Sequence, residues 1–220
     1  MTITSQAVQS DEAEVNTSPE LLSIPSQDIQ AEEQRYRIGA YGMLARLLRS
    51  SPDGSVLDRV AGFAEVEPAQ DELALAMSML GLAASTSRPE AVDDEFHNLF
   101  IGMGRGELVP YGSWYLTGFL MERPLGRLRD DLARLGFQRQ QGINEPEDHV
   151  AALCEVMAML IGDGSTIEAQ AQFFDSHLAD WLEGFFTDLS EAKSAIFYRA
   201  VGRFGAAFTG LEKHYLSMPV

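Results

Sequence analysis

The sequence NEPEDHVAALCEVMAMLIGDG, residues 144–164, carries the clearest helix signals in the chain. Pro146 suits the first position of a helix, because no backbone N–H is needed there. Glu147 and Asp148 would then lie in the first turn, where negative charge interacts favourably with the helix dipole. Apolar side chains follow at spacings of three and four residues, namely Val150, Leu153, Cys154, Met157, Leu160 and Ile161. The sequence therefore predicts a buried helix that begins at Pro146 and ends at the turn Gly162-Asp163-Gly164.

The same periodicity extends outward from this helix in both directions. It predicts further helices near residues 28–48, 56–63, 68–80, 89–100, 113–121, 124–135, 167–186 and 192–216. Neither a β-hairpin signal nor an alternation of strands and helices is present. We therefore expect an all-α, single-domain bundle of about eight to ten helices over residues 28–220. Residues 1–27 are polar and acidic and lack a sustained period, so they are expected to form a disordered tail.

The bulk composition restricts the classes of partner and the compartment. The formal net charge is −17 at pH 7, which argues against nucleic acid and anionic membrane surfaces and favours a basic partner. Ordinary solubility is an alternative explanation of this charge. The chain has one cysteine, and it lacks a secretory signal and a sufficiently long apolar run for a membrane span. We expect a cytoplasmic protein without an intramolecular disulfide.

Motifs for catalysis or cofactor binding give little support for an enzyme. The four histidines form no H-E-x-x-H motif, and Cys154 has no second cysteine for a zinc site. The acidic run Asp93-Asp94-Glu95 with His97 is interpreted as a solvated helix face rather than a metal site. GMGRG, residues 102–106, lacks the strand and helix context of a nucleotide-binding loop, so we interpret it as a flexible connector. Cys154 lies on an apolar stripe, which favours an inert buried thiol. No cofactor is therefore expected.

Three segments together resemble the TorD/DmsD/NarJ family of redox-enzyme maturation chaperones. They are FHNLFIG at residues 96–102, PYGSWYL at residues 110–116 and EPEDH at residues 145–149. The resemblance implies an all-α, non-enzymatic cytoplasmic protein that binds the twin-arginine leader of a molybdenum-cofactor oxidoreductase. It also implies binding of the apo form of that enzyme, and delay of its export until the cofactor is inserted. Members of this family are monomers or helix-exchanged dimers, and both states stay open here.

A twin-arginine leader has a basic stretch followed by an apolar one, so its binder needs an apolar groove with carboxylates at the mouth. We expect this groove beside the turn at Pro146, between Tyr111 and His149. Asp148 and His149 are the main candidates for leader contact, although helix-dipole placement and local hydrogen bonding are alternative roles. Most of the apolar candidates are alternatively core residues, and for Leu99 and Phe100 the core is the favoured interpretation. The full set of candidate peptide-binding residues is Asp148, His149, Glu145, Pro146, Tyr111, Pro110, Trp114, Phe96, Phe100 and Leu99.

Two other functions remain open on the sequence alone. One is a small enzyme whose site is dispersed along the chain, which no motif supports. The other is a helical scaffold or regulatory protein that binds another subunit rather than a leader peptide. Binding that survives deletion of a client's leader would favour the scaffold.

Overall fold

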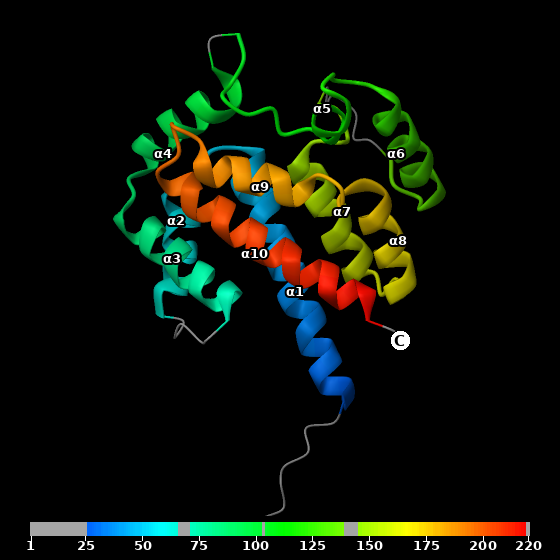
Figure 1. Cartoon of the computed structure of the whole chain (residues 1–220). Coiled ribbons are helices and arrows are strands. Elements are labelled where there is room, and N and C mark those ends of the chain that lie inside the picture. Colours follow the sequence, from blue (N-terminus) through cyan, green and yellow to red (C-terminus); the bar gives the residue numbers. More distant parts are fainter. Residues whose placement is uncertain (1–25, 66–70, 103, 139–144, 219–220) are drawn as a thin grey trace, which may run out of the picture.

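A computed structural model describes residues 26–65, 71–102, 104–138 and 145–218, and these form a helical bundle (Figure 1). The described residues contain ten α-helices, a short 3₁₀ turn and a π-helical turn, which confirms the predicted all-α fold. Residues 1–25 of the predicted tail lie outside the described residues, as do Pro68 and Asn144, whereas residues 26 and 27, also predicted as tail, belong to the first helix. The elements are α1 (Ser26–Arg49), α2 (Gly54–Ala61), η1 (Gly62–Glu65), α3 (Glu72–Thr86), α4 (Pro89–Phe96), η2 (His97–Ile101), α5 (Gly112–Thr117), α6 (Arg123–Arg134), α7 (Val150–Gly162), α8 (Ile167–His177), α9 (Leu182–Glu191) and α10 (Phe197–Ser217).

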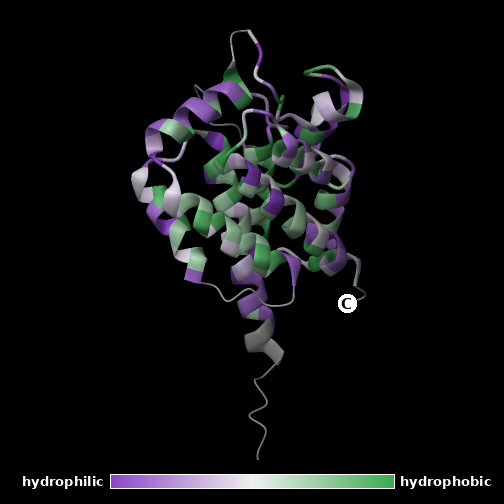
Figure 2. Ribbon diagram, turned by 60° about the vertical axis from the view of Figure 1, so that its left-hand side comes forward, coloured by the Kyte–Doolittle hydropathy of each residue, from purple (hydrophilic) through white to green (hydrophobic). Residues whose placement is uncertain are grey.

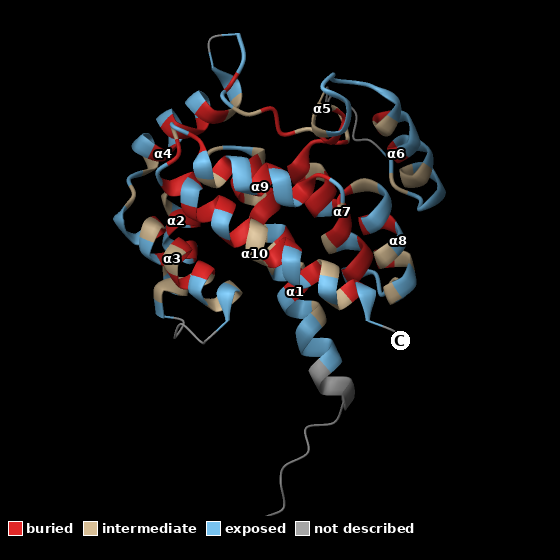
Figure 3. Ribbon diagram, viewed as in Figure 1, coloured by how far each residue is buried: buried red, intermediate tan, exposed pale blue. Residues whose placement is uncertain are grey.

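The core is built around α1, α7, α9 and α10. Helix α1 packs along α7, while α10 packs along α9 and also against α3. Hydrophobic residues gather at the centre of the bundle (Figure 2), and the buried residues lie on α7, α9, α10 and the second half of α1 (Figure 3). Aromatic side chains of the last helices are buried, among them Phe174, Phe185, Phe186, Phe197, Tyr198 and Phe204. Among the described helices, none combines the length and apolar character needed to cross a bilayer.

Two glycines allow α10 to approach α9 closely. A Cβ atom at Gly205 would lie 2.2 Å from the ring of Phe186, and one at Gly202 would lie 2.5 Å from the backbone nitrogen of Ser190. Contacts this short exceed what a packed interior can accommodate without a shift. The spacing of these glycines therefore fixes how tightly the two helices pack.

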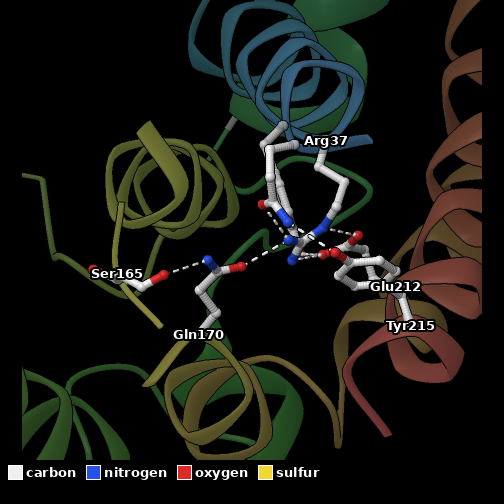
Figure 4. A network of polar contacts seen from close by, with 7 residues as sticks. Arg37, Ser165, Gln170, Glu212 and Tyr215 are labelled. Carbon is white, nitrogen blue, oxygen red and sulfur yellow. Dashed lines mark hydrogen bonds and ion pairs between the residues drawn. The ribbon is translucent and has the colours of Figure 1, made fainter. Parts of the chain in front are cut away.

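A buried polar network joins α1, α8 and α10 (Figure 4). The Arg37 guanidinium donates to both carboxylate oxygens of Glu212, at 2.6 and 2.8 Å, and to Gln170 Oε1 at 2.7 Å. Tyr41 also donates its hydroxyl to Glu212, at 3.0 Å, and the Tyr215 ring lies 4.5 Å from the guanidinium carbon. Arg37 and Glu212 are 4 % and 0 % exposed. Because buried charges are costly without partners, this pair specifies how α1 docks on α10.

The predicted start of α7 is wrong. The helix begins at Val150, and His149 is its N-cap with extended backbone angles of φ −64° and ψ 135°. Pro146 therefore precedes the helix, and Asp148 lies outside its first turn. The physical reason is that Pro146 begins a turn, in which its carbonyl accepts the N–H of His149, while the carbonyl of Asp148 accepts the N–H of Gly112.

Two other predicted helices are shorter than the sequence indicates. The region 167–186 contains two helices rather than one, because α8 ends at His177 and the indole N–H of Trp181 donates to the His177 carbonyl at 2.7 Å. The region 113–121 is helical only as far as Thr117. Gly118 then adopts φ 79°, a left-handed conformation that ends α5. Residues 119–121 consequently form a turn instead of another helical turn.

The acidic run before η2 is only partly solvated, which corrects our interpretation of it. Asp93 and Asp94 are exposed, whereas Glu95 is 7 % exposed. The Glu95 carboxylate accepts the backbone N–H groups of Ile196, Phe197 and Tyr198 at 2.7 to 3.0 Å. Glu95 thus satisfies the free amides at the start of α10 and delays that start beyond the predicted residue 192.

The glycine-rich segment also packs more closely than the expected flexible connector. Gly102 adopts φ 58°, and its N–H donates to the His97 carbonyl at 2.7 Å, which ends η2. Gly106 is buried, and a Cβ atom there would lie 2.5 Å from the carbonyl oxygen of Leu99. At least two of these glycines are therefore required by the backbone itself.

Candidate functional site

Two of the three sequence segments meet at a junction before α5 and α7. Tyr111 and His149 form an isolated antiparallel bridge. The N–H of Gly112 donates to the Asp148 carbonyl, and the N–H of Val150 donates to the Pro110 carbonyl, both at 2.9 Å. The predicted proximity of Tyr111 and His149 is therefore present. We call these paired residues, 110–113 and 145–150, the junction.

Asp148 is buried at the centre of the junction, with 3 % of its surface exposed. Its Oδ2 atom accepts the backbone N–H of Ser113 at 2.8 Å, at the start of α5. Its Oδ1 atom is buried and has no hydrogen-bond partner among the described residues. Asp148 borders a hollow between α5, α6 and α8 that also involves Arg127 and His177 and offers about 20 Å³. This is about the space that one water molecule needs, so a leader side chain does not fit without widening the hollow.

His149 is buried beside Tyr111 and is 5 % exposed. Its Nδ1 atom accepts the N–H of Ala151 at 3.1 Å, which leaves the ring proton on Nε2, 3.8 Å from a carboxylate oxygen of Glu145. Burial lowers the pKa of His149 to about 4, although Glu145 opposes this shift, so the ring is neutral at pH 7. The Tyr111 and His149 rings touch edge to face with centroids 5.0 Å apart. The apolar cleft that we expected between these two rings is therefore closed in this structure.

Glu145 is the carboxylate that links the junction to α1. Its oxygens contact Arg49 at 2.5 Å and the Tyr111 hydroxyl at 3.3 Å. Arg49 also pairs with Glu155 of α7 at 2.7 Å. Burial raises the pKa of Tyr111 to about 12, with a further contribution from Glu145, so the phenol stays protonated and donates. These contacts make the junction a fixed structural unit.

The junction holds an exposed apolar turn in place. The Ser113 hydroxyl oxygen, whose own backbone N–H is bound by Asp148, accepts the N–H of Met121 at 3.2 Å. Met121 adopts φ 61°, which is strained for a side chain of this size. Four apolar side chains here are exposed by 40 to 70 %; we call them the apolar loop, and they are Leu116, Phe119, Leu120 and Met121. The apolar pattern of residues 113–121 predicts one helix and therefore gives no indication of this surface; Gly118 is the signal in the sequence for an earlier helix end.

The remaining predicted residues divide into buried and partly exposed groups. Leu99 is fully buried, and Phe96 and Phe100 pack against Tyr198 of α10 with ring centroids 6.0 and 5.5 Å apart. Their segment lies apart from α5 (Figure 1), so the structure does not bring it to the junction. Trp114 is partly exposed, with the Arg105 guanidinium 5.0 Å from its ring. The other partly exposed members are Phe100, Tyr111, Glu145 and Pro146, whereas Pro110 is buried.

Chemistry other than binding has little basis at these residues. Within the described ranges, no group of three or more histidine, cysteine or acidic side chains is arranged to hold a metal ion. Cys154 is fully buried, and burial raises the pKa of its thiol well above the ordinary range, so it is unreactive.

Comparison with known proteins adds independent information. The family model described as nitrate reductase delta subunit matches residues 64–187. The chain is 32 % identical over 133 residues to the chaperone protein TorD of Vibrio cholerae serotype O1, covering 56 % of this chain and 60 % of that one. It is 27 % identical over 172 residues to the chaperone protein TorD of Vibrio parahaemolyticus, covering 71 % and 79 %. The chain thus spans about 60 % of the length of the first of these relatives.

A solved structure supports the fold. It is a crystal structure described as that of a redox enzyme maturation protein from Archaeoglobus fulgidus. The superposition has a TM-score of 0.53 at 18 % sequence identity and covers 79 % of this chain and 93 % of the other. At this identity the likeness concerns the helical arrangement alone.

Proposed function

Because the chain belongs to the nitrate reductase delta subunit family, the TorD/NarJ family of redox-enzyme maturation chaperones, we propose that it is a cytoplasmic maturation chaperone for a molybdenum-cofactor oxidoreductase. It binds the twin-arginine leader and the apo form of that client, and it holds back export until the cofactor is inserted. The observation that carries this proposal is the family match over residues 64–187, a range that includes both the junction and the apolar loop.

The apolar loop is the part of this region that a folded client would contact. Phe119 and Met121 are 69 % and 70 % exposed, and clustered exposed apolar side chains commonly mark interaction sites. The loop projects outward, so it suits a partner that has a pocket, such as an apo-enzyme awaiting its cofactor. Asp148 supports this contact through Ser113, which accepts the N–H of Met121.

The predicted contacts at the junction enter the proposal in two ways. Trp114, Glu145 and Pro146 are partly exposed and reach a client directly. Asp148 and His149 are buried, so they act by positioning their neighbours.

The test uses the molybdenum-cofactor oxidoreductases of the source organism that carry a twin-arginine leader, each in three forms: its leader peptide, its full precursor and the precursor without the leader. We expect micromolar or tighter binding of the leader and of the full precursor by calorimetry, with weaker binding once the leader is removed. Phe119→Ser should weaken binding of the precursor. Ile196→Ser changes a side chain that is 81 % exposed on another part of the surface, and it serves as the matched control.

Two outcomes would change the conclusion. Absence of binding to both leader and precursor would refute the proposed function. Equal binding of the precursor with and without its leader would instead support the alternative function, a helical scaffold that binds another subunit.

A further inference from the structure

A second apolar surface lies away from the junction, between α1, α3 and α10. These three helices enclose a groove of about 810 Å³. The helices adjoin one another in Figure 1, where α10 crosses between α3 and α1. Tyr36 and Leu211 on its edges are 69 % and 47 % exposed. Its apolar lining includes Met43, Leu73, Met77, Phe204 and Phe208.

The groove is concave and is formed by packed helices. Arg37, Glu212 and Tyr215 also line it, and the ion pair between Arg37 and Glu212 ties α1 to α10 beneath it. A surface that is formed before binding loses less conformational entropy when a partner arrives. A concave apolar surface between helices suits the apolar face of another helix, which would place side chains at positions i, i+3, i+4 and i+7 into it.

The charges at the groove favour a basic partner. Arg37 and Glu212 neutralise each other, which leaves two carboxylates, Glu33 and Asp71, against one guanidinium, Arg35. The whole chain has a net charge of −17. A second copy would carry the same charge, and residues 1–25 contain four carboxylates and neither lysine nor arginine. Like charges disfavour both of these occupants.

We infer that this groove binds the apolar run of the client's leader as a helix, with the basic pair of the leader beside Glu33 and Asp71. The inference rests on the proposed function, because the basic-then-apolar order of such a leader is the chemistry that matches the groove. It assigns the two ends of the client to two surfaces. The leader occupies the α1/α3/α10 groove, and the mature part contacts the apolar loop.

A glycine on α1 provides a way to fill the groove without disturbing the free protein. Gly39 lines the groove, and a Cβ atom built there meets nothing within 4 Å. Gly39→Leu should therefore occupy the space that the leader needs, while leucine favours a helix more than glycine does. Gly184 on α9 is likewise exposed with open space around its Cβ, so Gly184→Leu is the matched control.

The measurement is fluorescence anisotropy with the fluorescein-labelled leader peptide of the client. We expect Gly39→Leu to weaken binding by about tenfold or more, which corresponds to about 1.4 kcal/mol, and Gly184→Leu to leave it unchanged. Glu33→Lys should weaken binding of the native leader. It should not weaken binding of a leader whose two arginines are replaced by glutamine. A leader whose apolar run is changed to serine should bind neither the native protein nor the variants.

Crosslinking then separates failure of this inference from failure of the proposed function. Benzoylphenylalanine placed in the apolar run should crosslink to α3 and α10. One outcome would overturn the groove inference alone: the leader binds, Gly39→Leu does not change its affinity, and the crosslinks map to residues 116–121. In that case the chaperone function stands. If no leader binds the native protein at all, the proposed function fails, and the groove inference fails with it.

Discussion

Replacing Glu212 by glutamine should cause a large loss of stability, because it removes the counter-charge of a buried guanidinium. Glu212 is 0 % exposed, and its carboxylate accepts hydrogen bonds from Arg37 and from the Tyr41 hydroxyl (Figure 4). Breaking a buried ion pair by removing one partner costs about 3–5 kcal/mol. For a chain of this size, about 1 kcal/mol shifts Tm by about 2–4 °C, so Tm should fall by roughly 6–20 °C. This loss is large against a total stability of about 5–15 kcal/mol.

A double-mutant cycle tests whether desolvated charge is the cause. Arg37→Met and Glu212→Leu should each destabilise strongly, whereas the two substitutions together should cost less than the two single losses added together. The double variant still removes the partners of the Tyr41 hydroxyl and of the Gln170 Oε1 atom, at about 1–3 kcal/mol. Urea unfolding at pH 7 followed by circular dichroism provides the free energies, with unchanged m values as the check on two-state behaviour. A loss below about 1 kcal/mol for Glu212→Gln, or strict additivity in the cycle, would refute the reasoning.

Four further predictions follow from the buried polar groups and the helix packing. Burial lowers the pKa of His149 from about 6.5 to about 4, so on acidification the unfolded chain takes up the histidine proton before the folded chain does. The free energy of unfolding should therefore fall by up to about 3 kcal/mol as the pH drops from 6.5 to 4. In urea unfolding, His149→Asn should remove this contribution to the pH dependence of the free energy of unfolding. Gly205→Ala should lower the free energy of unfolding by about 1–3 kcal/mol, because its Cβ would overlap the Phe186 ring. Glu95→Gln should cost about 1–3 kcal/mol, since an amide N–H would face the amides at the start of α10. Asp148→Ala should destabilise the protein and weaken its binding of the client precursor. Asp148→Asn keeps an acceptor for the Ser113 N–H, so it should retain most of the stability and most of the binding affinity. Urea unfolding and calorimetry of the same variants measure the two quantities.

Matched variants show which results would contradict these predictions. Burial also lowers the pKa of His177, so its contribution to the pH dependence should persist in His149→Asn, and an unchanged total slope would show that His149 is not responsible. Gly184→Ala, with open space around its Cβ, should be neutral or stabilising. Equal losses for Gly184→Ala and Gly205→Ala would show that helix packing is not the cause.

The sequence predicts the existence of the helices more reliably than their ends. Apolar periodicity reports which face of a segment is buried, and that face is a local property of each helix. The start of α7 depends instead on the carbonyl of Asp148, which is held by the N–H of Gly112. The helix signals at Pro146 cannot reveal a partner that lies more than thirty residues away in the chain. For the same reason, nothing local indicates that Glu95 caps α10 or that Arg37 pairs with Glu212.

At the candidate site, the sequence motifs predict where the residues lie, whereas the packing of the helices determines how exposed they are. The EPEDH and PYGSWYL segments correctly point to one place, because the structure pairs Tyr111 with His149. Their exposure could not be predicted, since it depends on how α5, α6 and α8 enclose Asp148. The same limit hid the apolar loop, because Phe119 and Met121 have the composition of core residues and are exposed only through the turn at Gly118.

The burial of the motif residues changes what their chemistry can mean. A carboxylate that contacts a client must be reachable, yet Asp148 is 3 % exposed and already accepts the Ser113 N–H. Through Ser113 the same carboxylate sets the position of Met121 and hence of the apolar loop. A buried, hydrogen-bonded residue keeps such a strained turn in one conformation, which an exposed residue could not do as well. In the function that we propose, the buried part of the motif therefore serves recognition by fixing a surface, while the contacts with the client are made by exposed residues of the junction, the apolar loop and the groove lined by α1.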